Sequence, residues 1–158
     1  MKTNPAETAT LERMAPGVLS RDGFLGTDSR SIAEIVATDR AAFEEAGVAP
    51  EDAADVLDEI HEAADAALGT SVSLYGGSVT AQITEVRGRI PCPFADGVQA
   101  HKAVLDLRFA DHRIQVTPLG IHLLRSHCFL QGRAAPFRVE PGQLIELYEL
   151  VRGQRAIG

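Results

Sequence analysis

The sequence contains no tryptophan, only two cysteines, and only two lysines among its fifteen basic residues. Two cysteines are too few for the disulfide framework of a small secreted protein, so we expect two free thiols and a cytoplasmic location. No apolar run is long enough to cross a membrane, and residues 1–16 lack the apolar segment of a signal peptide. These absences predict a soluble chain with no membrane partner.

Several motifs that would indicate an activity are also missing. The chain has no GxxxxGK[ST] phosphate loop, no GxGxxG dinucleotide fingerprint and no GxSxG nucleophile elbow. It also lacks the Cys-x-x-Cys pair that is typical of structural zinc sites. Motifs alone therefore assign no reaction.

The charge is negative overall and unevenly distributed. The formal net charge is −7, and residues 28–69 hold 12 acidic and 2 basic residues, a balance of −10. Nucleic acid binding needs a dense basic face, so we expect no nucleic acid partner. The acidic stretch is typical of a solvated helical face, and the alternative is a docking surface for a basic partner.

Helical periodicity predicts two helices in this acidic part. Ser31 and Glu34 form a capping box, and apolar residues follow at helical spacing until Gly47. Pro50 opens a second helix, which ends at Gly69. Because few residues separate the two, we expect an antiparallel helical hairpin.

After this hairpin the apolar period changes from 3.6 to 2, which indicates strands. A two-residue turn at Gly76-Gly77 pairs Leu74 with Val79 and places the apolar side chains on one face. Agreement between the turn and the alternation predicts a first β-hairpin.

A second alternating segment lies downstream. A turn at Asp111-His112 pairs Phe109 with Ile114 and Leu107 with Val116, again on one apolar face. We therefore expect two β-hairpins in one antiparallel sheet of four strands.

Two helices are predicted after the sheet. Thr117 caps a helix that begins at Pro118 and continues to about residue 130, and Pro141 begins another that ends at Gly153. The fold class is therefore α+β, with an N-terminal helical hairpin, a four-stranded antiparallel sheet made of two β-hairpins, and two C-terminal helices. The expected organisation is a flexible N-terminal tail at 1–27, one domain at 28–153 and a C-terminal tail at 154–158.

Cys92 is the first candidate functional residue. It lies between two prolines, within about fifteen residues that match neither a strand nor a helix pattern and that we expect to cross between the two hairpins. A reactive thiol needs a nearby cation, an imidazole or a helix N-terminus. Cys92 and His122 are therefore the candidate catalytic residues, and the alternative is that Cys92 packs the loop onto the core.

A zinc site is a second reading of the same region, and no cofactor is the alternative. The candidate metal ligands are Cys92, His101, His127 and Cys128. His122 stands five residues before His127, which places the two about 140° apart around a helix. We therefore expect that these two histidines cannot bind one ion unless the helix ends between them.

Arginines supply the candidates for binding a small anionic ligand. Alternation places Arg108 and Arg113 on the polar face of the sheet, and guanidinium groups suit carboxylates and phosphates. Arg87 and Arg89 precede Cys92, and Arg125 belongs to the following helix. The alternative is an ordinary solvent-exposed sheet face.

Two function classes remain. The first is a non-catalytic binding or assembly module, which would often be a homodimer joined through an edge strand. The second is a small enzyme or metal-binding protein whose site lies between the Cys92 loop and the helix at 118–130. The sequence specifies neither a substrate nor a physiological partner.

Overall fold

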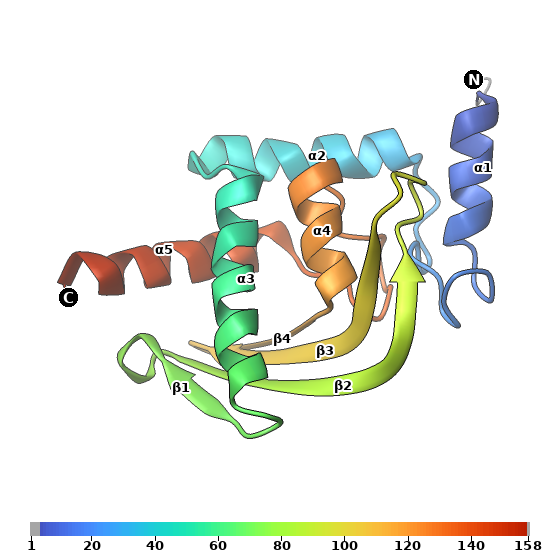
Figure 1. Cartoon of the computed structure of the whole chain (residues 1–158). Coiled ribbons are helices and arrows are strands. Elements are labelled where there is room, and N and C mark those ends of the chain that lie inside the picture. Colours follow the sequence, from blue (N-terminus) through green and yellow to red (C-terminus); the bar gives the residue numbers. More distant parts are fainter. Residues whose placement is uncertain (1–3, 158) are drawn as a thin grey trace.

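The structure, a computed structural model, describes residues 4–157. Its elements in chain order are α1 (Pro5–Met14), α2 (Ile32–Ala46), α3 (Pro50–Ala66), β1 (Val72–Leu74), a 3₁₀ turn η1 (Tyr75–Gly77), β2 (Val79–Pro91), β3 (Gln99–Phe109), β4 (His112–Val116), α4 (Pro118–His127) and α5 (Pro141–Ile157). Figure 1 shows a curved sheet with the helices gathered over one of its faces. The fold is the predicted α+β class.

The sheet is an antiparallel meander in which every strand pairs with its neighbour in sequence, in the order β1-β2-β3-β4. Its apolar face is fully buried under the helices, as shown by Val79, Ala81, Leu105 and Leu107, which are all 0% exposed. The alternate residues of β2 and β4, including Thr80, are exposed on the other face. This arrangement explains the period of two, because only one face of an antiparallel sheet needs to meet the core.

The register of the first hairpin is confirmed, whereas that of the second is shifted by two residues. Leu74 pairs with Val79, as the Gly76-Gly77 turn predicted. Phe109, however, pairs with His112 rather than Ile114, because the chain turns at 110–111. A shift of two residues returns each side chain to the same face, so the alternation alone could not distinguish the two registers.

The Cys92 region is the tip of a long β2–β3 hairpin, and the prediction of an irregular crossover was wrong. The pairing continues as far as Pro91 and Gln99, with an irregularity between Glu85 and Arg89. Beyond this irregularity the hairpin bends upward from the sheet and brings its tip toward α4 (Figure 1). Only residues 92–98 remain as a loop.

The connection between α2 and α3 is tight, but the two helices do not run antiparallel. Gly47 ends α2 in the left-handed conformation, with φ of 69°, and Pro50 begins α3. In Figure 1, α2 runs across the top of the molecule while α3 runs down toward the sheet. The boundaries of the last two helices also differ from expectation, because α4 ends at His127 and α5 continues through Gly153.

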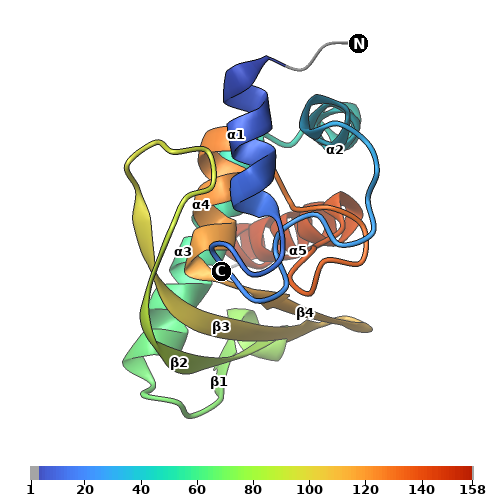
Figure 2. The same ribbon diagram turned by 90° about the vertical axis from the view of Figure 1, so that its right-hand side faces the viewer.

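A helix occupies the start of the chain, where the sequence showed no period. Asn4 caps α1 by accepting from the Glu7 amide, and Met14 at its end is completely buried. Arg13 Nε donates to the Pro93 carbonyl oxygen at 2.6 Å, which holds α1 beside the hairpin tip (Figure 2).

The segment after α1 joins the chain that follows α4. The Gly132 amide donates to the Phe24 carbonyl oxygen and the Thr27 amide to that of Arg133, both at 2.8 Å. These bonds bring the two backbones so close that a Cβ atom on Gly132 would overlap the Leu25 carbonyl. We call these contacts between residues 24–28 and 132–135 the terminal seam.

Substitution of Gly132 by alanine is expected to destabilise the fold by roughly 1–3 kcal/mol, the usual cost of overpacking a close contact. Denaturant unfolding measures the change. Gly142→Ala is the matched control, because no heavy atom lies near its would-be Cβ in α5, and it should leave stability unchanged or raise it by up to about 1 kcal/mol. Equal stability of Gly132→Ala and the wild type would show that the seam is not close-packed.

A buried ion pair fixes α2 to the chain before α5. Arg138 donates to both carboxylate oxygens of Asp39, at 2.7 and 2.9 Å, and the two side chains are only 9% and 3% exposed. Arg138 also donates to the Gln131 carbonyl oxygen at 2.8 Å. The hydrogen bonds to Asp39 raise the pKa of Arg138 above its ordinary value, despite the opposing effect of burial.

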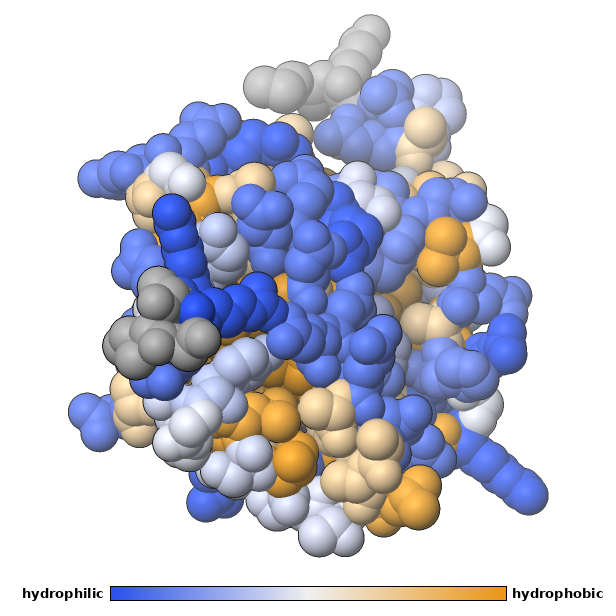
Figure 3. Space-filling model, turned by 60° about the vertical axis from the view of Figure 1, so that its left-hand side comes forward, coloured by the Kyte–Doolittle hydropathy of each residue, from blue (hydrophilic) through white to orange (hydrophobic). Residues whose placement is uncertain are grey.

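The surface over α3 and α5 is mostly hydrophilic, and apolar side chains show through mainly toward the sheet (Figure 3). This agrees with the interpretation of the acidic segment as a solvated helical face. Within residues 4–157, no helix has both the length and the apolar character needed to cross a membrane.

Candidate metal centre

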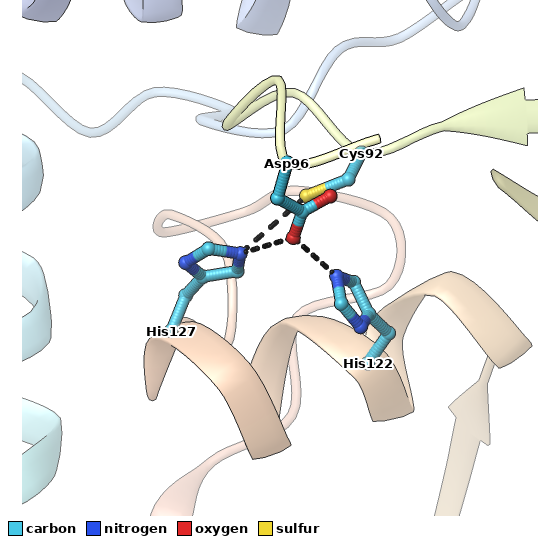
Figure 4. Close-up of side chains that lie close together, drawn as sticks. All are labelled: Cys92, Asp96, His122 and His127. Atoms are coloured by element: carbon cyan, nitrogen blue, oxygen red, sulfur yellow. Dashed lines mark hydrogen bonds and ion pairs between the residues drawn. The ribbon is translucent and has the colours of Figure 1, made fainter. Parts of the chain in front are cut away.

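The loop at the hairpin tip is held in a defined shape by its own hydrogen bonds. The Cys92 amide donates to the Val98 carbonyl oxygen at 2.9 Å, which closes the loop at its base. The Val98 amide donates to Asp96 Oδ1 at 3.0 Å, a local contact typical of aspartate in turns. Ala95 and Gly97 have positive φ, at 56° and 84°. The second carboxylate oxygen, Oδ2, is left to face outward from the loop toward α4 (Figure 4).

Helix α4 supplies the other side of the site. The Thr117 hydroxyl caps it by accepting from the Gly120 amide at 2.9 Å, and Pro118 occupies its first turn. The helix ends at His127 because Cys128 adopts the left-handed conformation, with φ of 49°. Its last two turns therefore present His122 and His127 to the loop.

Four potential ligands converge between these elements. His122 Nε2 and His127 Nε2 lie 2.7 and 2.8 Å from the same atom, Asp96 Oδ2. Cys92 Sγ lies 3.6 Å from His127 Nε2. One donor atom from each of the four residues falls within 4.8 Å of all the others, as seen in Figure 4.

Packing holds these side chains in place. The Phe94 ring stacks on His127 with ring centroids 4.1 Å apart and planes inclined by 15°. Ser126 Oγ lies 3.4 Å from His122 Nδ1. This hydroxyl can accept from Nδ1–H, the tautomer that leaves Nε2 available to a metal ion.

The electrostatics of the loop differ between its two donor residues. Burial opposes ionisation of Asp96, but hydrogen bonds from His127, the Val98 amide and His122 outweigh it and lower the pKa below its ordinary value. Burial raises the pKa of the Cys92 thiol to about 11. Cys92 is 2% exposed. The metal-free site therefore contains a carboxylate and a protonated, inaccessible thiol at neutral pH.

The donor set fits zinc. Sulfur, two imidazole nitrogens and one carboxylate oxygen are all ordinary zinc ligands, and four protein ligands complete a tetrahedral shell. With the usual bond lengths, neighbouring ligand atoms in such a shell lie roughly 3.3–3.6 Å apart. The separation between Cys92 and His127 already has this size, while the oxygen of Asp96 would have to move slightly away from the two nitrogens.

Two of the four metal ligands named from the sequence do not belong to this cluster. His101 is exposed on β3, paired with Arg89. Cys128 packs in the main core between the sheet and the helices, whereas Cys92 belongs to the smaller core around Phe129. Both cysteines are free thiols.

The expectation that α4 would keep the side chains of His122 and His127 apart was wrong. Both nitrogens reach the same Asp96 oxygen, although both residues lie within α4. The loop lies across the end of the helix, and the two rings meet edge to face with centroids 5.5 Å apart. Long side chains can therefore converge from positions that a helical wheel separates.

The candidate anion-binding arginines are not gathered at one place. Arg113 is engaged with both carboxylate oxygens of Asp106, and Arg125 bridges Asp55 and Asp58 on α3. The other three, Arg87, Arg89 and Arg108, are exposed on the hairpin and the sheet. Two of the five thus serve as ion-pair partners within the fold.

Asp96 is the residue that sequence reasoning missed. It follows Cys92 by four positions and precedes Gly97, a pair typical of turns. That pair marks a tight loop in which a carboxylate can be held close to the thiol. Nothing in the periodicity connects it to α4.

Comparisons with known proteins found no matching family model, no matching curated protein and no matching solved structure. The site must therefore be interpreted from its own chemistry.

Proposed function

We propose that this chain is a zinc-binding protein in which the ion joins the tip of the β2–β3 hairpin to the end of α4. The observation that carries the proposal is the convergence of four donor atoms, from Cys92, Asp96, His122 and His127, within 4.8 Å. Thiolate and imidazole donors favour zinc among the common divalent ions, whereas magnesium and calcium prefer oxygen.

The role of the ion in this proposal is structural. Four protein ligands leave no coordination position for a substrate, which is the usual difference between structural and catalytic zinc. A two-stranded hairpin that extends beyond its sheet is weakly stable on its own. The proposal therefore places the chain with binding or assembly modules rather than with enzymes.

The alternative role of Cys92 as a nucleophile has less support. A nucleophilic cysteine needs a lowered pKa and access to its substrate, whereas burial raises the pKa of Cys92 and leaves it 2% exposed. Metal binding would remove the thiol proton, so a buried thiol next to imidazoles is better explained as a ligand. Two free thiols also suit a reducing compartment such as the cytoplasm.

Cobalt substitution tests the proposal directly. The metal-free protein titrated with Co²⁺ is expected to bind one equivalent and to develop a thiolate-to-cobalt charge-transfer absorption, because Cys92 supplies a sulfur ligand. Cys92→Ser should abolish that absorption. Cys128→Ser is the matched control, since Cys128 is equally buried but lies outside the cluster, and it should retain the full signal. Loss of the band in both variants or in neither would contradict the proposed ligand set.

A further inference from the structure

A cavity of about 270 Å³ lies beside the outer half of the β2–β3 hairpin. Its walls come from four parts of the chain: residues 20–24 after α1, the outer half of the hairpin, Thr117 and Leu119 at the start of α4, and residues 131–137 after α4. None of the four zinc ligands lines it. A molecule in this cavity would therefore occupy a site separate from the proposed zinc ion.

Most of the cavity wall is apolar. Phe24 and Leu119 are buried there at 4% and 3% exposure, and Ile90, Val104 and Phe137 are half-buried. The volume has room for about ten non-hydrogen atoms, taking about 30 Å³ for each water-sized group. A small apolar molecule would remove this wall from water, which is the main source of affinity in such sites.

One polar side chain in the wall has no partner. Gln131 is only 4% exposed, and no residue within the described range 4–157 hydrogen-bonds its side-chain amide. Its backbone has φ of 72°, which is uncommon for glutamine and is held by the bond from Arg138 to its carbonyl oxygen. Every fully buried side-chain N or O atom among the described residues has a hydrogen-bond partner, so the Gln131 amide borders open space, where its N–H groups can donate to an acceptor on a bound molecule.

The mouth of the cavity carries a surplus of positive charge. Arg21 and Lys102 are exposed at its edge. The one carboxylate there, Asp22, lies 3.7 Å from Arg21 and so offsets that cation. Lys102 forms no ion pair with the residues that the structure describes. The mouth therefore favours an anion.

We propose that this cavity binds a small organic acid, namely a monocarboxylate of about ten non-hydrogen atoms in all, with an unbranched or compact apolar body. The apolar body packs against Phe24, Ile90 and Phe137. The carboxylate accepts a hydrogen bond from the Gln131 amide and is attracted by Lys102. Apolar lining combined with a few convergent polar groups is the usual composition of a small-molecule site.

Calorimetric titration of the full chain with octanoate tests this proposal. We expect one molecule bound per chain. Octanol, which keeps the apolar chain but lacks the charge, should bind distinctly more weakly. No binding at millimolar octanoate, or equal binding of octanol, would overturn the proposal.

Charge reversal locates the site. Lys102→Glu is expected to weaken octanoate binding by about tenfold, which corresponds to about 1.4 kcal/mol. Arg108→Glu makes the same charge change on an exposed residue of the polar sheet face and should leave binding unchanged. Equal weakening by both variants, or by neither, would overturn the assignment. Because Lys102 is exposed, its replacement should not disturb folding.

Backbone chemical shifts of the wild-type chain, recorded with and without octanoate, provide an independent map of the bound acid. Shift changes confined to residues outside the cavity would also contradict the proposal.

Discussion

Replacement of His127 by phenylalanine is expected to weaken Zn²⁺ binding by at least about a hundredfold. Loss of a group that only orients a metal ligand typically costs 10–100-fold in affinity, and loss of the ligand itself should cost more. Phenylalanine keeps a ring where His127 stacks on Phe94 at 4.1 Å, so the change removes a nitrogen donor with little loss of packing. Competition with a chromophoric chelator measures the affinity.

His101→Phe is the matched control for this experiment. His101 is an exposed histidine of β3, outside the cluster, and its replacement should leave the zinc affinity unchanged. If the two variants bind zinc equally well, His127 is not a ligand.

Zinc should also stabilise the wild-type fold. At a free zinc concentration a hundred times the dissociation constant, binding to the folded state alone contributes about 2.7 kcal/mol. For a chain of this length that raises the unfolding temperature by roughly 5–11 °C. Thermal unfolding of the His127→Phe variant should show no comparable rise over the same zinc concentrations.

Replacement of Arg138 by alanine is expected to lower the free energy of unfolding by about 3–5 kcal/mol, because it leaves the carboxylate of Asp39 buried without its partner. Asp39 is 3% exposed and receives two hydrogen bonds from Arg138. The unfolding temperature should fall by roughly 6–20 °C. Denaturant and thermal unfolding both measure the effect.

Two controls separate this pair from ordinary surface charges. Arg113→Ala removes an arginine that also contacts both oxygens of a carboxylate but is 58% exposed. The free energy of unfolding of this variant should therefore hardly differ from that of the wild type. The double variant Asp39→Ala/Arg138→Ala should be less destabilised than the sum of the single variants, because no charge is left unpaired. Additive losses would show that the two side chains stabilise the fold independently.

Local sequence patterns predicted most of the secondary structure. The Ser31–Glu34 capping box, the Gly47 stop and the Thr117-Pro118 start each correspond to an observed helix end. The Gly76-Gly77 turn also predicted the register of β1 and β2 correctly. In each case, residues close in sequence determine the backbone conformation through their own hydrogen bonds or allowed φ angles.

The errors arose where distant contacts decide the structure. The outer half of the β2–β3 hairpin rises away from the core, so its exposed residues 85–89 have no reason to alternate, and the strand pattern disappears. The end of α1 is held by the contact of Arg13 with Pro93, eighty residues away. Periodicity cannot reveal such partners.

The candidate site was only partly predictable, for the same reason. Cys92 and His122 indicated that the loop and the helix meet, and His127 was named as a ligand from its residue type. Asp96 and the pairing of the two histidines depend on how the loop lies across the end of α4, which is a tertiary feature. The fourth candidate ligand, Asp96, could therefore be identified only from the structure.

The meander and the terminal seam impose very different entropic costs on the folding chain. Each hairpin of the sheet is closed by a turn of a few residues, and its strands are neighbours in sequence. The seam instead joins Thr27 and Asp28 to Arg133, across 106 and 105 positions. Since the entropy lost in closing a loop grows with its length, the backbone contacts that bring the early and late parts of the chain together have the larger conformational penalty, and the sheet provides the local contacts that fold rapidly.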